Sequence, residues 1–313
     1  MSNHSDKVYS LTRQTSQAAN SPVAASWLRC MNIHKLAPDA KQTPERLSEQ
    51  EFRHATDRST ILVEESRDEL DRLFALTGRS GHCLLLTDEK GVALDRRGSA
   101  GDDKDFRGLG LWSGTVWSEA SVGTNGIGTA LADQRAALIQ RDQHFLESNI
   151  GLSCTAAPIR DHVGRLSGAI DMSTCRDDAT EMTMSILSHA VRDAALRIEG
   201  NIFRRAFPKA RIVMVGSGYG ALLAVDRDDI VLGATRGARS ALGIDDSRIA
   251  SGIPAADLLN EGFFAESADL IEAERSALRR AISRHNGNMS RTAESLGISR
   301  ATLHRKVKRL GLN

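Results

Sequence analysis

The chain has 313 residues, of which 41% are hydrophobic and 26% are charged, and its formal net charge is only +1. This composition is typical of a globular protein with room for two or three domains, and it excludes a disordered tail or a fibre. No stretch approaches the roughly 18 apolar residues that span a bilayer, and the N-terminus lacks the apolar core of a signal peptide, so we expect a cytoplasmic protein without a membrane partner.

The first 200 residues are expected to form an α+β fold. Residues 1–45 form an N-terminal helical arm, and residues 46–200 a domain in which helical periodicity covers 47–76 and 182–203. Two hairpins are predicted between these helices. The first has strands at 83–86 and 92–94, and the second has strands near 155–159 and 166–172. Antiparallel strands with helices packed on them make an α+β domain.

The segment between the hairpins, "GLWSGTVWSEASVGTNGIGTALADQRAALIQRDQHF", combines two tryptophans with a Gly-Thr-Asn-Gly turn. Residues 117–131, taken with "SWLRC" at 26–30, resemble the signature of the GAF sensor domain of acetoin-type catabolic regulators. The resemblance covers about residues 20–200 and implies a small-molecule effector held between the sheet and the helices. Such a pocket needs flat apolar walls with a few polar groups. The candidates for lining it are Trp112, Trp117, Glu119, Thr124, Asn125, His144 and Cys154. The alternative is that these side chains are simply core.

A third segment, "RIVMVGSGYGALLAV", has the outline of a dinucleotide fingerprint. Its context differs from that fingerprint, because the following residues are typical of a strand, a turn at 226–229, a second strand and a short helix near 238–242. Residues 205–262 look like the PAS-like module that follows the GAF domain in the same regulators. An enzyme that uses the glycine-rich segment on a nucleotide stays open as a rival hypothesis.

The C-terminal end is strongly basic. Residues 272–313 hold ten Lys or Arg against three Asp or Glu, which leaves 31 against 37 for residues 1–271. A first helix is expected from about residue 266, a second over 290–296, and a third from Arg300, with Ser299 as its N-cap. The third helix buries Leu303, Val307 and Leu310. From charge alone, a solvated amphipathic helix would be an equal alternative to a module that binds a polyanion.

The spacing of Ala293, Gly297 and Leu303 favours a helix-turn-helix. The last 45 residues or so resemble the Fis-type domain at the C-terminus of many bacterial regulators. The resemblance implies DNA contacts, with Arg300 as the best candidate for a bidentate guanine contact. The full set is Asn288, Ser290, Ser299, Arg300, Thr302, His304, Arg305, Lys306 and Lys308. Relatives pair through the first helix, so Leu270, Ile271 and Leu278 are expected in a homodimer interface that lets two recognition helices read an inverted repeat.

Motifs of catalysis are missing from the sequence. There is no G-x-x-x-x-G-K-[ST], so we expect this chain to lack the ATPase that many relatives use to drive sigma-54 polymerase. Four scattered cysteines show no metal-ligand spacing, and no cofactor is indicated. We therefore expect a transcription regulator rather than an enzyme. Its partners would be double-stranded operator DNA, a small-molecule effector and a second copy of the chain, and RNA polymerase is a further candidate. The alternative is a Fis-like architectural DNA-bending protein with a vestigial sensor.

Overall fold

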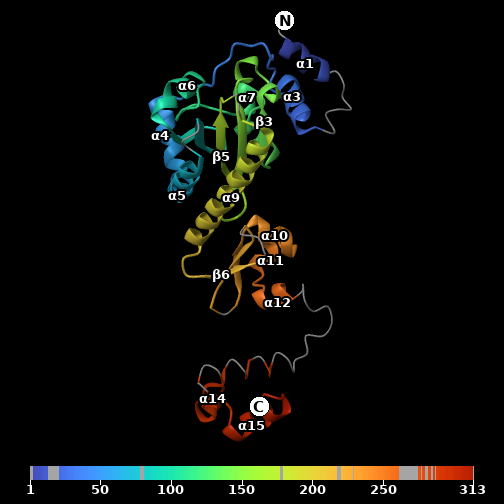
Figure 1. Cartoon of the computed structure of the whole chain (residues 1–313). Helices are drawn as coiled ribbons and strands as arrows, with labels where there is room; N and C mark the ends of the chain where they lie inside the picture. The colour runs from blue at the N-terminus through green and yellow to red at the C-terminus, as the bar shows by residue number, and fades with distance from the viewer. Residues whose placement is uncertain are drawn as a thin grey trace. The chain divides into compact units, whose positions relative to one another are not determined.

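The computed structural model of the chain describes residues 3–12, 21–77, 81–176, 179–216, 220–227, 229–260, 274–275, 277–278, 281–282, 285 and 287–312. The chain divides into two compact units, residues 1–254 and 255–313 (Figure 1). No helix in the described ranges is long and apolar enough to cross a membrane.

The first unit is built on an antiparallel sheet. Its described strands lie in the order β2-β1-β5-β4-β3, with these bounds: β1 His82–Asp88, β2 Ala93–Gly98, β3 Ala137–Gln140, β4 Ser153–Arg160 and β5 Leu166–Thr174. The two predicted hairpins, β1–β2 and β4–β5, are confirmed. They join through antiparallel pairing of β1 with β5, and β3 extends the sheet beside β4. The α+β expectation is therefore confirmed for this unit.

Helices cover both faces of this sheet. On one face, α5 (Thr60–Thr77) and α9 (Glu181–Ala206) pack on Leu84, Leu86 and their neighbours. On the other face, α3 (Pro22–Asn32), α7 (Glu119–Val122) and α8 (Gly126–Asp133) pack around Cys83 and Leu85. The alternation along β1 follows from the two-residue period of a strand. The sheet is therefore the middle layer of three.

Shorter elements complete this part of the chain. The helix expected over 47–76 is divided, because α4 (Glu49–Arg58) ends at Ser59 before α5 begins. The remaining bounds are α1 Asn3–Thr12, η1 Ala100–Asp102, α6 Asp103–Gly108, η2 Arg141–Gln143 and η3 Glu147–Asn149.

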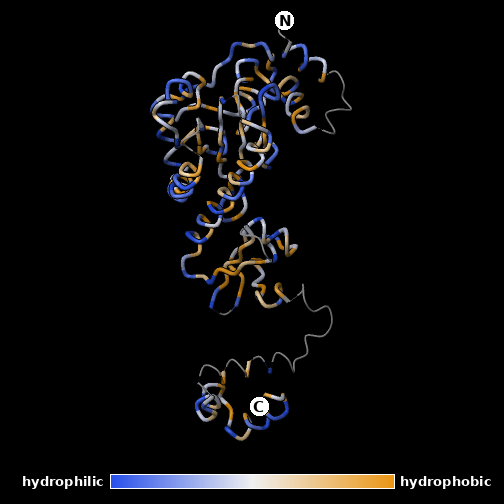
Figure 2. Tube along the Cα trace, viewed as in Figure 1, coloured by the Kyte–Doolittle hydropathy of each residue, from blue (hydrophilic) through white to orange (hydrophobic). Residues whose placement is uncertain are grey.

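Residues after α9 form a small second sheet. Its described strands, in the order β6-β7-β8, are Arg211–Met214, Leu222–Val225 and Val231–Ala234. They are among the orange segments of Figure 2, since their residues are mostly apolar. Phe203 of α9 packs with Leu222 and Ala224, which fixes this sheet against the end of the long helix. The short helices α10 (Arg236–Leu242) and α11 (Asp246–Ala250) follow.

The glycine-rich segment leads into a strand. Residues 217–219 lie outside the described residues, and β7 begins three positions after them, at Leu222. A dinucleotide-binding turn would open a helix at this point. The strand agrees with our rejection of that motif.

The second unit contains the basic C-terminus. Its described elements are α12 (Ala255–Asn260), α14 (Met289–Ser295) and α15 (Arg300–Arg309). Leu303, Val307 and Leu310 are buried with Ala293 and Leu278, as expected for the first three. Leu278, which we expected in a dimer interface, thus packs in the core of its own unit. Leu270 and Ile271 lie outside the described residues.

Candidate functional sites

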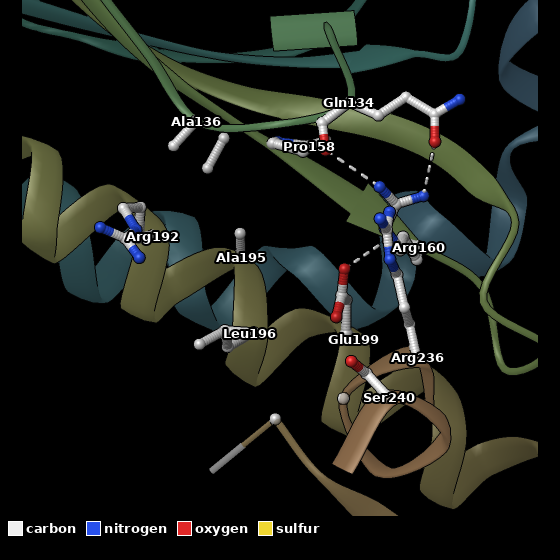
Figure 3. Close-up of a pocket in the computed structure, with 13 residues that line it drawn as sticks. Gln134, Ala136, Pro158, Arg160, Arg192, Ala195, Leu196, Glu199, Arg236 and Ser240 are labelled. Atoms are coloured by element: carbon white, nitrogen blue, oxygen red, sulfur yellow. Dashed lines mark hydrogen bonds between the residues drawn. The ribbon is translucent and has the colours of Figure 1, made fainter. Parts of the chain in front are cut away.

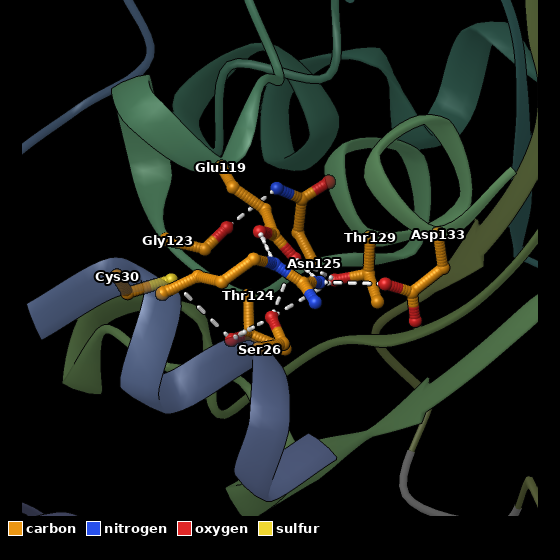
Figure 4. A network of polar contacts seen from close by, with 9 residues as sticks. Ser26, Cys30, Glu119, Gly123, Thr124, Asn125, Thr129 and Asp133 are labelled. Carbon is orange, nitrogen blue, oxygen red and sulfur yellow. Dashed lines mark hydrogen bonds and ion pairs between the residues drawn. The ribbon is translucent and has the colours of Figure 1, made fainter. Parts of the chain in front are cut away.

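A buried polar network joins α3 to α7 and α8 (Figure 4). At its centre lies Glu119, which is 3% exposed. Ser26 Oγ and Thr129 Oγ1 donate to its Oε1 at 2.5 and 2.9 Å, and Arg29 Nε donates to its Oε2 at 2.8 Å. Arg29 also pairs with Asp133 at 2.9 Å. Hydrogen bonding to Glu119 raises the pKa of Arg29. The network therefore holds α3 against α7 and α8.

The Gly-Thr-Asn-Gly turn mainly serves the start of α8. Asn125 is the N-cap, and its Oδ1 accepts the Gly128 backbone N–H at 2.8 Å. Thr124 Oγ1 lies 2.6 Å from Ser26 Oγ, within the Glu119 network. Gly128 must be glycine, because a Cβ there would come within 2.6 Å of the Glu119 backbone nitrogen. The signature that suggested a ligand pocket thus also has a local structural role.

The two tryptophans of the motif lie in different surroundings. Trp117 is 1% exposed, and its Nε1 donates to Gly110 O at 3.1 Å. Trp112 is partly exposed, and the guanidinium groups of Arg96 and Arg107 lie over its ring at 4.2 and 4.1 Å from the centroid. Such stacking is favourable and holds the indole in place.

A second polar cluster lies beneath the start of α8. Ser173 Oγ donates to Asp171 Oδ2 at 2.6 Å and lies 3.1 Å from Cys154 Sγ. Cys154 Sγ in turn lies 3.4 Å from His144 Nε2, and His144 Nδ1 lies 3.0 Å from Arg141 O. The structure therefore brings together His144 and Cys154, two of the predicted pocket residues. We call the group of His144, Cys154, Asp171 and Ser173 the Asp171 cluster.

Burial dominates the electrostatics of the Asp171 cluster. Asp171 is 1% exposed, and its Oδ1 has no hydrogen-bond partner. Burial raises the pKa of Asp171 to about 7, lowers the pKa of His144 to about 4, and raises the pKa of the Cys154 thiol. At neutral pH the cluster therefore offers an uncharged imidazole, a thiol that is not a nucleophile, and a carboxyl close to half-protonated.

Sequence reasoning missed several members of these two groups. Ser26, Arg29 and Thr129 were not selected, because each reaches Glu119 only after folding brings α3 and α8 together. Asp171 had a readable signal, since it is an acidic residue inside the apolar strand segment "GAIDMS". Across the described ranges, no group of three or more His, Cys, Asp or Glu side chains is arranged to hold a metal ion.

The C-terminal unit presents the predicted DNA-contacting residues around α15. Asn288 caps α14 by accepting backbone N–H bonds from Ser290 and Arg291, and Ser299 caps α15 by accepting from Thr302. The basic or polar side chains that α15 exposes to solvent are Arg300, His304, Arg305, Lys308 and Arg309.

One acidic residue faces this basic surface. Glu274 forms ion pairs with Lys306 and Arg309, which lowers the pKa of its carboxyl. Two of the cations of α15 are thereby partly neutralised within the unit, whereas Arg300 and Arg305 have no ion-pair partner among the described residues.

Comparison with protein families matches both ends of the chain. Residues 4–199 match the model of the MimR N-terminal domain, and residues 270–310 match the model of bacterial regulatory proteins of the Fis family. The resemblances to acetoin-type regulators and to a Fis-type helix-turn-helix are thus confirmed.

Individual relatives are regulators of transcription. The acetoin catabolism regulatory protein of Cupriavidus necator is 34% identical over 181 residues, which are 58% of this chain and 27% of that protein. The propane 2-monooxygenase operon transcriptional activator MimR of Mycolicibacterium smegmatis is 29% identical over 222 residues, which are 69% of this chain and 36% of that protein. The chain thus spans about a third or less of the length of these two relatives.

A solved structure shares the fold. The E. coli DhaR(N) chain in the crystal structure of the DhaR(N)–DhaL complex superimposes with a TM-score of 0.54 at 19% sequence identity. The superposition covers 82% of this chain and 86% of that chain.

Proposed function

The chain belongs to the family defined by the MimR N-terminal domain, and on this basis we propose that it is a transcription regulator whose C-terminal helix-turn-helix binds DNA under the control of a small molecule. The organisation we propose is an arm at 1–45, a sensor domain at 46–200, a PAS-like segment at 205–262 and the DNA-binding domain at 266–313. Its partners would be operator DNA, an effector and a second copy of the chain, with RNA polymerase as a further candidate.

The observation that carries this proposal is the two-sided character of α15. Leu303, Val307 and Leu310 are buried on one side, whereas Arg300 and Arg305 are exposed with no ion-pair partner among the described residues. A helix that keeps one free guanidinium group in its first turn and another on its exposed face is suited to the major groove. The proposed contacts are Asn288, Ser290, Ser299, Arg300, Thr302, His304, Arg305, Lys306 and Lys308.

The roles within that set differ. Arg300 lies in the first turn of α15, where residues of a recognition helix meet base edges, so we assign it to base readout. Lys308 lies in the last turn and would contact phosphate. Asn288 and Ser299 already use their side-chain oxygens as helix caps, so their part would be to orient backbone N–H groups toward phosphates.

The proposed control by a small-molecule effector is argued from the interior of the first unit. The residues proposed to contact the effector are Trp112, Trp117, Glu119, Thr124, Asn125, His144 and Cys154. Those with the best support are His144 and Cys154, because they lie in the Asp171 cluster, whose carboxyl keeps one buried oxygen without a partner. A buried acceptor without a partner is costly, and the O–H donor of a small hydroxyl compound would relieve that cost. Glu119 instead has its oxygens bonded by Ser26, Thr129 and Arg29.

The proposed binding to DNA is tested with a duplex selected from a random pool. Arg300→Ala should weaken binding to the selected duplex by about 1–3 kcal/mol and relax base preference at one position. Lys308→Ala should weaken binding to all duplexes alike and reduce the salt slope by about one. Arg67→Gln, which removes an exposed cation from α5, is the control and should change neither. Equal binding by wild type and by a protein with both Arg300 and Arg305 changed to Glu would refute the proposal.

The proposed control by an effector needs a separate experiment. Protein purified under native conditions is denatured, and the released small molecules are identified by mass spectrometry. The operator affinity is then measured with and without each compound. An operator affinity that no released compound alters would remove the switch while leaving DNA binding in place. Strong bending of DNA with weak sequence preference would instead favour the architectural alternative.

A further inference from the structure

A cavity on the other side of the sheet from α8 has no role in the function proposed above. It measures about 330 Å³ and is lined by β4, the turn before β3, the middle of α9 and the start of α10 (Figure 3). This volume lies at the lower end of the roughly 300–1,000 Å³ typical of small-molecule sites. The cavity is therefore large enough for a compact metabolite.

The polar groups of the cavity are mainly cationic. Arg192 of α9 and Arg236 of α10 are exposed, lie toward opposite ends of the group of lining residues, and have no hydrogen-bond or ion-pair partner among the described residues. Arg160 of β4 also lines the cavity, but its guanidinium already donates to Gln134 at 3.1 Å. Two free guanidinium groups favour anionic ligands, since each can bind a carboxylate with two parallel hydrogen bonds.

Between the two arginines the wall is aliphatic. Ala195 and Leu196 of α9 lie along it in Figure 3, and Ala157 and Pro158 of β4 also line the cavity. A ligand that suits this arrangement has charge at its two ends and methylene groups between them, because methylene groups gain from leaving water.

One acidic side chain, Glu199, lies at the Arg236 end. Its Oε1 accepts the backbone N–H of Arg160 at 2.8 Å. Burial raises the pKa of Glu199 to about 8, so near pH 7 the carboxyl is mostly protonated and can donate to an anion. The charged groups that line the cavity with it are Arg160 from β4, Arg236 from α10 and Arg192 on its own helix.

We propose that this cavity binds a short aliphatic dicarboxylate, with one carboxylate on Arg192 and the other between Arg236 and Glu199. Such a ligand would join the sensor sheet to the segment after α9, because β4 and α9 form one wall and α10 the other. Gly164 of the β4–β5 turn already lies against Arg236, where an added Cβ would come within 3.5 Å of the Arg236 Cβ. A dicarboxylate would therefore act as a second effector, and this regulatory part rests on the proposed function.

Titration calorimetry on the full chain tests the binding. The probes are malonate, succinate, glutarate and adipate, each tested alone, with butyrate and glutaramide as probes that lack one or both charges. At least one dicarboxylate should bind at millimolar concentration near pH 7. Arg192→Gln and Arg236→Gln should each weaken it about tenfold or more, the expected loss of a hydrogen bond to a charged group. Arg67→Gln on α5 is the matched control and should leave the affinity unchanged.

Glu199 gives a second, independent readout. Wild-type affinity should fall between about pH 7 and pH 9, as the carboxyl ionises and repels the ligand. Glu199→Gln should keep its affinity over that range. Failure of all four dicarboxylates to bind, butyrate binding as tightly as the best of them, or an equal loss in Arg67→Gln would overturn the site. An equal fall with pH in Glu199→Gln would overturn the role of Glu199. Operator affinity without ligand is measured in parallel, so that failure here is distinct from failure of DNA binding.

Discussion

Replacing Asp171 with asparagine should stabilise the first unit by an amount that grows with pH. Asp171 is 1% exposed, and burial raises the pKa of its carboxyl from 3.8 to about 7. Between these values the unfolded chain releases its proton while the folded protein keeps it. The folded state then binds more protons than the unfolded state, so stability falls as the pH rises through this window. Asparagine has no such proton, so Asp171→Asn removes this fall of stability with rising pH.

The size of the effect follows from the two pKa values. With one pKa unit equal to about 1.4 kcal/mol, the ionisation of Asp171 costs the wild type about 2 kcal/mol at pH 5 and about 4 kcal/mol at pH 8. The stability of Asp171→Asn relative to wild type should therefore rise by about 2–3 kcal/mol between pH 5 and pH 8. The amide NH2 takes the place of Oδ1, which has no partner, and its desolvation lowers the gain by a similar amount at each pH. The slope with pH is thus the quantity to measure.

Urea unfolding followed by tryptophan fluorescence measures this slope. All three tryptophans, Trp27, Trp112 and Trp117, lie in the first unit, so the signal reports that unit and not the DNA-binding one. Asp193→Asn, which changes an exposed carboxylate of α9, is the matched control with which the slope of Asp171→Asn is compared. If Asp171→Asn and wild type differ by the same amount at pH 5 and pH 8, the carboxyl is not the buried acid described above.

Three further outcomes are expected. His144→Gln should gain stability relative to wild type as the pH falls from about 6.5 to about 4. Burial lowers the pKa of His144 to about 4, so in this range only the unfolded wild-type chain takes up the proton. The same fluorescence assay measures the gain. Glu119→Gln should lower the free energy of unfolding of the first unit by about 1–3 kcal/mol, since the partly buried Arg29 loses a charged acceptor; an unchanged urea midpoint would contradict it. Glu274→Gln should raise affinity for any duplex about two- to fivefold at low salt, because it frees two cations of α15, and the gain should vanish at high salt.

Local chemistry explains which parts of the fold could be predicted from the sequence. Each correctly placed hairpin turn contains an aspartate whose Oδ1 accepts backbone N–H bonds two and four residues later. Asp88 accepts from Lys90 and Val92, and Asp161 accepts from Val163 and Arg165. Because each of these bonds spans at most four residues, the local sequence is sufficient to predict the turn. The helix-turn-helix was readable for the same reason, since its caps and its turn are local.

Long-range pairing accounts for what the sequence left out. Strand β3 has four residues, too few for an alternation pattern, and only its pairing with β4 identifies it. The junction of the two hairpins, β1 with β5, joins residues 80 or more positions apart. The Glu119 network likewise depends on contacts such as Ser26 with Glu119, 93 residues apart, which no spacing rule contains.

The Glu119 network and the Asp171 cluster differ in a way that bears on function. Glu119 meets donors from Ser26, Thr129 and Arg29, so this group is self-sufficient, and any ligand that bound it would have to displace a protein donor. Asp171 has one donor and one oxygen without a partner, so a ligand that supplies a hydrogen bond there would displace no protein donor. Gly126 begins α8 directly above that oxygen, and an added Cβ would come within 2.6 Å of it. Access to Asp171 therefore requires α8 to move, and α8 is tied to the N-terminal arm through the Glu119 network. Binding at Asp171 would thus strain the contacts of α3, which gives an effector a physical route from the core of the domain to its N-terminal arm.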